Sequence, residues 1–556
     1  MVHTKLVSAT IARPPEEVFD WVTTPGYWPQ CSPITLGVET PEPWRPLREG
    51  DHCREHVRVL AWRGHFDLKV EILERPFRCV LTGAVAGDSV LSRLAVHEHA
   101  RIEYTLSEEN GGTRITRELT YPLEGVAAII GNLVAFGPAL DKACEITIET
   151  MVSMLENPFL HGPQPDVTAE SWLHEADPLA DDAVACLVSE SGDCGSLESF
   201  LAGLYRGDPS PDDVPEPMRR FLEATTTLPK WACTPRIEEA SKVFLEWGLL
   251  SVAAHICASL PETYEMPRTA KLLNITQQLD RDPTHADRRL WFTVRMCFDV
   301  LNEGGLTSSG HGIIALQRLR LLHAMVRMFV QRRLETPHRL AGLASGGVWD
   351  TENGQPISQM ELLHTLFTFS HVVVRSFDIW ECGLTPYQHE SYIHIWNIAG
   401  VMLGIRPELL PRSAADAARM FEEIKSRYGA ATPEATKLGG ALVNFWTGLV
   451  PEVARKEAME LMQYVVSTLL SPETAKINGF DDLPAFSPKA VNTVRECVKI
   501  GDRLCREAFT DVPPSREAAA LIVSLLIRKF SDPYEDDSGI FDIPDVLYTR
   551  WVGTPT

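Results

Sequence analysis

The sequence predicts a multidomain protein in which an N-terminal α+β domain precedes a large all-α domain. Residues 1–158 contain short runs of alternating polar and apolar residues, which are typical of antiparallel strands, and end in a long amphipathic segment. Residues 159–182 are rich in Pro, His, Gly and Asp, as expected of an exposed linker. In residues 183–535 apolar residues recur at helical spacing without a fixed-period repeat, and residues 536–556 are expected to form a C-terminal tail.

Local patterns predict the N-terminal elements. Residues 5–12 should form a strand, and the helix that begins near residue 13 has proline in its first turn, followed by two acids. Asn110-Gly-Gly112 supplies the permissive backbone of a hairpin turn. A long amphipathic helix is expected at residues 139–155. The strands between these helices are placed at residues 56–62, 65–73, 78–82, 100–107 and 113–121.

This order of a strand, a helix, antiparallel strands and a long closing helix resembles the SRPBCC superfamily of polyketide cyclases and START-like lipid carriers. The segment Ile-Ala-Arg-Pro-Pro-Glu-Glu-Val-Phe-Asp-Trp-Val at residues 11–22 contributes to the resemblance. It implies an α+β helix-grip fold with a cavity for apolar molecules between the sheet and the last helix, and no catalytic residue is assigned there. Polar groups expected near this cavity include Arg54, His56, Arg58, Trp62 and His65.

The rest of the chain reads as helices separated by short loops. The predicted helices are residues 196–203, 237–260, 270–279, 288–300, 317–334, 358–382, 386–403, 414–428, 434–449, 451–470, 487–509 and 515–530.

Composition restricts the class of protein. The chain has 556 residues and a net charge of −23, which argues against nucleic-acid binding and against anionic membranes as partners. Its 12 cysteines are scattered without a Cys-x-x-Cys pair, as expected of reduced thiols. No signal peptide and no long uninterrupted apolar run are visible, so a cytoplasmic protein without a membrane span is expected.

Residues 317–330 are the most informative stretch of the helical region. Three polar groups, Arg320, His323 and Arg327, interrupt its apolar surface. At about 100° per residue, both arginines lie within about 60° of the histidine on one helix face. Buried cations require anionic partners, and a haem would satisfy this face, with iron on His323 and its carboxylates on the arginines. The alternative is a core histidine flanked by arginines that pair with Asp or Glu of a neighbouring helix.

Two further histidines, His364 and His371, are seven residues apart and share one face of the expected helix. Packing in the core explains them more simply than metal binding does.

Four blocks in order resemble the rubber oxygenase (latex clearing protein) and MpaB-type oxygenase family. They are Arg-Arg-Leu-Trp-Phe-Thr at 288–293, the arginine–histidine helix after a Gly-rich loop, the segment 357–370, and the segment 383–405. The resemblance covers about residues 230–450 and implies an all-helical catalytic domain that binds haem b. It also implies that His323 is the proximal iron ligand, that Arg320 and Arg327 contact the haem, and that Arg289 and Thr293 form the polar pair on the distal side.

The sequence departs from the rubber-oxygenase pattern at two points. Those enzymes place a lysine that caps the iron one residue before the distal threonine, and this chain has Phe292 there. We therefore expect an open or water-bound sixth position. They also use an acidic base on the preceding helix, and none is found between Leu272 and Gln278.

Together with these patterns, the resemblance implies a haem b-dependent oxygenase of secondary metabolism. Its expected partners are O2 and an apolar small molecule, such as a polyketide, terpenoid or other alkene, while rubber itself is not expected. One alternative is a polyketide cyclase or isomerase with its chemistry in the N-terminal domain. Another is a non-catalytic haem- or lipid-binding protein. The oligomeric state stays open.

Overall fold

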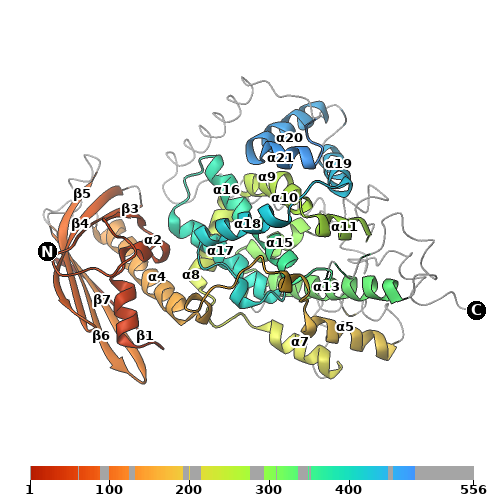
Figure 1. Ribbon diagram of the computed structural model, residues 1–556. Coiled ribbons are helices and arrows are strands. Elements are labelled where there is room, and N and C mark those ends of the chain that lie inside the picture. Colours follow the sequence, from red (N-terminus) through yellow and green to blue (C-terminus); the bar gives the residue numbers. More distant parts are fainter. Residues whose placement is uncertain are drawn as a thin grey trace, which may run out of the picture. The chain divides into compact units, whose positions relative to one another are not determined.

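The structure is a computed structural model (Figure 1). It describes residues 2–60, 62–87, 99–123, 132–191, 200, 214–275, 293–307, 310–335, 349, 352, 354–448, 452 and 455–481. The chain divides into two compact units. The N-terminal unit comprises residues 1–163, 230–239 and 383–394, and the helical unit comprises residues 164–229, 240–382 and 395–556.

The N-terminal unit is built on one antiparallel sheet of seven strands in the order β1-β7-β6-β5-β4-β3-β2. This arrangement confirms the predicted helix-grip domain, although the short strand β2 was not predicted. The strands are β1 (Val2–Ile11), β2 (Thr35–Glu39), β3 (His52–Val59), β4 (Trp62–Glu74), β5 (Arg78–Gly87), β6 (Ala100–Glu109) and β7 (Gly112–Pro122). The helices are α1 (Pro15–Val22), α2 (Trp28–Cys31) and α4 (Gly137–Glu156), the last preceded by a π-helical turn at Asn132–Phe136.

The hairpin between β6 and β7 forms at the predicted turn. Asn110 and Gly111 have φ angles of 52° and 79°, which are the positive values that a two-residue hairpin loop requires. Glu109 pairs with Gly112 on either side of the loop. This register turns the odd-numbered apolar residues of β7 toward the core, including Ile115 and Leu119.

One face of the sheet packs against α4, and the residues buried between them form the core of the unit. Alternating residues of β3, β4, β6 and β7 are buried on this inner face, and α4 contributes Leu140, Cys144, Ile148, Met151 and Leu155. The outer face carries charged side chains, as expected of an antiparallel sheet covered on one side.

Two short segments from the helical half of the sequence complete the N-terminal unit. The hydroxyl of Ser153 on α4 donates to the carbonyl of Trp231 at 2.6 Å. The guanidinium of Arg236 donates to the carbonyl of Gln30 at 2.6 Å and is only 6% exposed. The unit therefore draws on residues that are distant in sequence.

The helical unit consists of many short and medium helices, in agreement with the predicted all-α domain. Its described helices are α5 (Pro178–Ser191), α7 (Glu216–Thr226), α8 (Thr234–Glu246, which begins in the N-terminal unit), α9 (Gly248–Ala254), α10 (Leu260–Tyr264), α11 (Pro267–Ile275), residues 293–301, α13 (His311–Glu335), α15 (Gln359–Phe369), α16 (His371–Ile379), α17 (Pro386–Met402, shared between the two units), α18 (Ala414–Tyr428), α19 (Pro433–Gly448), α20 (Arg455–Leu469) and α21 (Pro472–Ile477).

Two segments that were predicted as single helices are divided. Residues 237–260 form α8, α9 and the π-helical turn His255–Ser259, called η7. Residues 358–382 form α15 and α16, which separate at Ser370. A π turn contains one residue more than an α-helical turn, so the side chains that follow it point in a different direction around the helix axis. An analysis that assumes 3.6 residues per turn does not detect this change. The predicted helices at 487–509 and 515–530 lie outside the described residues.

Within the described ranges, no single helix combines the length and the apolar character of a membrane span. The bent pair Thr234–Glu246 and Leu250–Tyr264 satisfies these two criteria only when it is taken together.

Candidate functional site

Helix α13 carries the predicted haem-binding face. Its residues Leu321, Ala324 and Met325 are buried against α5 and α7. His323 lies on the same helix and is half-buried. The two arginines that flank it occupy different environments.

Arg320 is bound to an acid of its own unit. Its Nε and Nη2 atoms donate to the two carboxylate oxygens of Asp177 at 2.7 and 2.9 Å. The third nitrogen, Nη1, donates to the carbonyl of Met402 at 3.2 Å, and the guanidinium lies 5.6 Å from the ring centre of Phe221. Arg320 is 8% exposed. Its charge is thus neutralised in a bidentate pair, which is the alternative left open by the sequence.

Arg327 is only partly neutralised. Its Nε donates to Asp181 Oδ1 at 2.8 Å, while Nη1 and Nη2 are buried and have no hydrogen-bond partner among the described residues. The residue is 1% exposed. Burial raises the pKa of Asp181, and Arg327 offsets part of this rise. A buried guanidinium with two unused nitrogens is suited to bind one more anion, such as a carboxylate.

These observations provide a test of whether the face fits a haem. Arg327 lies four residues after His323, one helical turn away, so a carboxylate held by its unused nitrogens is within reach of a ring bound at the histidine. Arg320 has no unused nitrogen for a second carboxylate. The residues therefore fit the group, with one arginine available rather than two.

The predicted distal pair is described only in part. Thr293 is half-buried at the start of the helical residues 293–301. Arg289, the other predicted member, and Phe292 lie outside the described residues. Whether Arg289 and Thr293 face His323 therefore stays a prediction.

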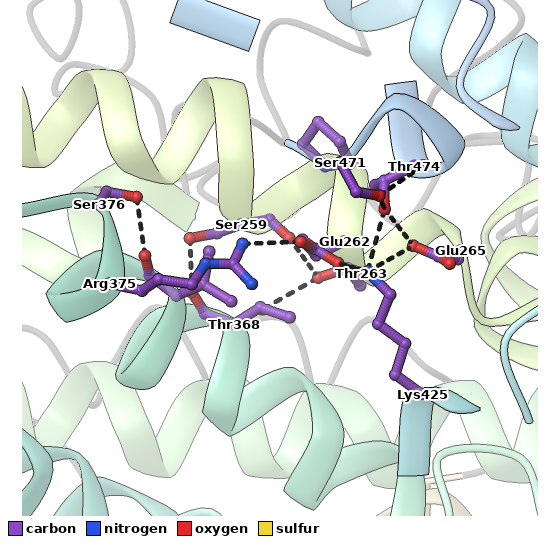
Figure 2. A network of polar contacts seen from close by, with 12 residues as sticks. Ser259, Glu262, Thr263, Glu265, Thr368, Arg375, Ser376, Lys425, Ser471 and Thr474 are labelled. Carbon is purple, nitrogen blue, oxygen red and sulfur yellow. Dashed lines mark hydrogen bonds and ion pairs between the residues drawn. The ribbon is translucent and has the colours of Figure 1, made fainter. Parts of the chain in front are cut away.

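A buried acid does occur before the predicted distal residues, at a position that the sequence analysis did not consider. Glu262 on α10 is 1% exposed and lies in the polar network of Figure 2. Arg375 of α16 donates to its Oε1 at 2.7 Å, and Lys425 of α18 donates to its Oε2 at 2.6 Å. Although burial alone raises the pKa of Glu262, the two cations hold it below its usual value. Glu262 is therefore an ionised structural anion rather than a base.

The network continues through Glu265 to α21. Lys425 Nζ lies 3.1 Å from Glu265 Oε2, and the Thr474 hydroxyl donates to the same oxygen at 2.8 Å. Burial raises the pKa of Glu265, and Lys425 offsets this only in part. Ser259 and Thr263 attach the same segment to Thr368 at the end of α15, as Figure 2 shows.

Three buried or half-buried histidines lie near this network in the helical unit. Burial lowers the pKa of His255, His364 and His371 to about 4 in each case, so all three are neutral near pH 7. The rings of His364 and His371 lie 5.2 and 5.5 Å from that of Phe421, although the break at Ser370 puts them on separate helices. No three His, Cys, Asp or Glu side chains are grouped as ligands of a bare metal ion in the described part of the chain.

The N-terminal unit contains a cavity of about 30 Å³ between its sheet and α4. The polar side chains on its wall include Glu55 of β3, Tyr104 of β6 and Arg117 of β7. Burial raises the pKa of Glu55, and it raises the pKa of Tyr104 to about 12. Apolar residues form most of the remaining wall, including Trp28 and Met151.

The prediction of the cavity residues was largely wrong, because the strand register places most of these side chains on the outer face of the sheet. Arg54 forms an ion pair with Asp67 at 2.6 Å, and both side chains are more than 40% exposed. His56 contacts Glu39 at 2.9 Å, and its side chain is 38% exposed. Arg58 and His65 share this outer parity, and neither lines the cavity. Glu55, between Arg54 and His56, points inward as strand alternation requires.

Comparison with known proteins identifies the helical region. Residues 273–519 match the family model described as ER-bound oxygenase mpaB/B'/Rubber oxygenase, catalytic domain. The chain is 24% identical to the Rubber oxygenase of Streptomyces sp. (strain K30) over 286 residues, which are 51% of this chain and 64% of that protein. It thus spans slightly less than two thirds of that relative's length.

Three solved structures are similar to parts of the chain. The structure of Latex Clearing Protein LCP in the closed state is 20% identical, with a TM-score of 0.47, and the match covers 71% of this chain and 94% of that one. Protein MLL2253 from Mesorhizobium loti is 17% identical, with a TM-score of 0.22 and coverage of 28% and 98%. Ara h 8.0201 is 18% identical, with a TM-score of 0.19 and coverage of 26% and 96%.

The family match begins within α11 and includes the whole of α13 with Arg320, His323 and Arg327. The helical region of this chain therefore carries an MpaB/rubber-oxygenase-type catalytic domain.

Proposed function

We propose that the protein is a haem b-dependent oxygenase that uses O2 to oxidise an apolar small molecule, such as a polyketide, terpenoid or other alkene. His323 would hold the iron, and Arg327 would bind a haem carboxylate through its Nη atoms. The observation that carries the proposal is the buried, half-used guanidinium of Arg327 one turn from His323, inside a region that matches an oxygenase family.

The chain's own residues would have distinct tasks. Asp181 would fix the orientation of Arg327, because it accepts from Nε and leaves Nη1 and Nη2 without a hydrogen-bond partner among the described residues. Thr293 and Arg289 would donate hydrogen bonds on the distal side, next to dioxygen. When bound, the haem would supply the redox chemistry that activates dioxygen, which no side chain of this site can supply.

The N-terminal unit would bind a small apolar compound in the cavity between its sheet and α4. That compound is the substrate or product of the helical unit in this proposal. We further propose that the protein acts in the cytoplasm in secondary metabolism, which rests on the sequence patterns alone.

The test is the absorption spectrum of the protein after loading with haem. We expect a Soret band at one haem per chain in the wild type and its loss in His323→Ala, with the far-UV helical signal retained. His311→Ala is the matched control, because His311 is an exposed histidine on the same helix. Equal haem content in His323→Ala and wild type would remove His323 from the proposed role.

The same preparation separates the rival functions. A cofactor-free cyclase or isomerase would show no Soret band but would turn over its substrate. A haem or lipid carrier would bind its ligand without consuming O2 in the presence of alkene substrates.

A further inference from the structure

Arg236 of α8 is a buried cation of the N-terminal unit, and it forms no ion pair with a described acid. The residue is 6% exposed. Its Nη2 atom donates to the carbonyl of Gln30 at 2.6 Å and lies 3.3 Å from Met154 Sδ. Its Nε atom is buried and has no hydrogen-bond partner among the described residues. Glu239 on the same helix accepts from Gln388 at 2.9 Å instead.

The titratable groups around Arg236 do not supply the missing negative charge. Burial raises the pKa of the Cys31 thiol to about 12 and also raises the pKa of Cys233, so both thiols stay protonated. Burial raises the pKa of the Tyr387 hydroxyl, and it lowers the pKa of His394 well below its usual value. All four groups are therefore neutral near pH 7. Because an uncompensated buried charge is costly, Arg236 favours the binding of an anion.

Hydroxyl groups lie close to this cation. Thr150 Oγ1 of α4 and the Tyr387 hydroxyl oxygen of α17 are 3.4 Å apart. Cys233, three residues before Arg236, lies 3.8 Å from Thr150 Oγ1 through its sulfur atom. The Thr150 hydrogen bond and then the charge of Arg236 offset part of the rise that burial causes in the pKa of Tyr387, so the cation and this hydroxyl are near one another. Arg236 and Tyr387 therefore offer two donors to one ligand.

These residues are distinct from the cavity between the sheet and α4. Thr147 and Met151 of α4 line that cavity. Thr150 and Met154 follow them by three residues each, which turns their side chains about 60° around the helix axis. Neither of them lines the cavity, and Arg236 does not line it either. An anion bound to Arg236 would therefore occupy a second site.

The charge and the donors of the site decide which anion fits. The guanidinium carries a single positive charge, so a monoanion neutralises it, whereas a phosphate dianion leaves one negative charge unpaired in the interior. A carboxylate has two oxygens, one of which can accept from Arg236 while the other accepts from the Tyr387 hydroxyl. Chloride is a single sphere and cannot divide its contacts in this way.

We propose that Arg236 and the Tyr387 hydroxyl bind the carboxylate of a small organic acid. The site lies in the N-terminal unit, but both residues come from segments that follow the predicted N-terminal domain in sequence. The proposal depends neither on haem binding nor on a ligand in the cavity between the sheet and α4.

Acetate and its neutral isostere acetamide test the site on the full chain, in a ligand-observed NMR titration in chloride-free buffer near pH 7. We expect acetate to bind at least about tenfold more tightly than acetamide, because only acetate accepts charge-assisted hydrogen bonds as an anion. Arg236→Met should weaken acetate binding at least about tenfold, and Tyr387→Phe should weaken it about three- to tenfold.

Arg54→Met is the matched control. Arg54 belongs to the same unit, but it is exposed and pairs with Asp67 at 2.6 Å, so its loss should leave acetate binding unchanged. Arg236→Lys keeps the charge without the Nε donor and should retain part of the affinity. If Arg236→Met does not fold, the order of acetate and acetamide on the wild type and the effect of Tyr387→Phe decide the question.

Each contrary outcome overturns a defined claim. Equal binding of acetate and acetamide would remove the anion site. Acetate binding that survives both Arg236→Met and Tyr387→Phe would place the carboxylate elsewhere on the chain. Chloride that competes more strongly than acetate would overturn the assignment of a carboxylate. None of these outcomes alters the haem test on His323.

Discussion

Buried acids and bases occur in both units, but they are arranged differently. In the helical unit Glu262 touches Arg375 and Lys425 directly, and Lys425 also touches Glu265. In the N-terminal unit Glu55 and Arg117 line one cavity without touching. Charges in direct contact satisfy one another, so that removing either partner is costly, whereas charges separated by a cavity leave room for a ligand.

The same contrast occurs on one helix. Arg320 and Arg327 are both buried on α13, but only Arg320 has all three nitrogens bonded, to Asp177 and Met402. Arg327 has two nitrogens that no described residue bonds. The two arginines therefore differ in their hydrogen-bonding environment, which residue type alone does not distinguish, and only Arg327 has nitrogens left for the proposed haem carboxylate.

The largest expected effect is the loss of Lys425. Lys425→Met leaves Glu262 with Arg375 alone and Glu265 with the Thr474 hydroxyl alone, both in the interior. Removing one partner of a buried ion pair costs about 3–5 kcal/mol. We expect the denaturation midpoint of the helical signal to fall accordingly in urea. Arg419→Met on the same helix is the control, since its ion pairs with Asp416 and Glu423 are exposed and should contribute about 1 kcal/mol or less.

A smaller effect should separate the two arginines of α13. Arg320→Met strands Asp177, whose side chain is 4% exposed, so we expect a loss of about 3 kcal/mol in the free energy of unfolding. Arg327→Met strands Asp181, which is 36% exposed and reaches water, so the loss should be about 1 kcal/mol. Haem affinity should show the reverse order, with at least about a tenfold loss in Arg327→Met. Equal losses of stability in Arg320→Met and Arg327→Met would contradict the conclusion that the two arginines contribute differently to the fold.

The smallest effect is a pH dependence. The pKa of His364 is about 4 in the folded protein against 6.5 in an exposed histidine, so the unfolded chain takes up a proton first as the pH falls. The contribution of neutral, buried His364 to the free energy of unfolding is therefore fully present above pH 6.5 and is lost as the pH falls from 6.5 to 4. We expect His364→Phe to reduce the loss of stability between pH 7 and pH 5 by about 2 kcal/mol.

The measurement is the thermal unfolding midpoint at pH 7, 6 and 5. His52→Phe is the control, because His52 is exposed on β3 and should leave the pH dependence unchanged. A His364→Phe variant with the pH profile of the wild type would show that another group controls acid unfolding.

The sequence predicted the elements whose signals are local. The Asn110-Gly111 hairpin, the helix at Pro15 and the long helix α4 depend on turn chemistry, proline placement and amphipathic spacing, and all three were confirmed. The breaks at η7 and Ser370 were missed because both neighbouring helices keep good apolar spacing. The participation of residues 230–239 and 383–394 in the N-terminal unit is a tertiary feature that no local pattern encodes.

The candidate site was predictable in its residue types and less so in its partners. The requirement for anions opposite Arg320 and Arg327 followed from burial. Asp177 and Asp181 meet part of it, and both lie in the segment 159–182 that was predicted to be a linker. Glu262 was overlooked, although it interrupts an apolar run and so carried a signal. Glu55 was passed over because the predicted strand began at residue 56, whereas β3 begins at His52 and includes Glu55.

The network of Figure 2 also has a consequence for local fluctuations. Glu262, Arg375, Lys425 and Thr474 come from α10, α16, α18 and α21. If one of these helices opened on its own, it would leave an uncompensated charge or hydroxyl in the interior, so independent fraying is unfavourable. The backbone amides of the four helices should therefore exchange with solvent as one cooperative unit, slowly and with similar protection.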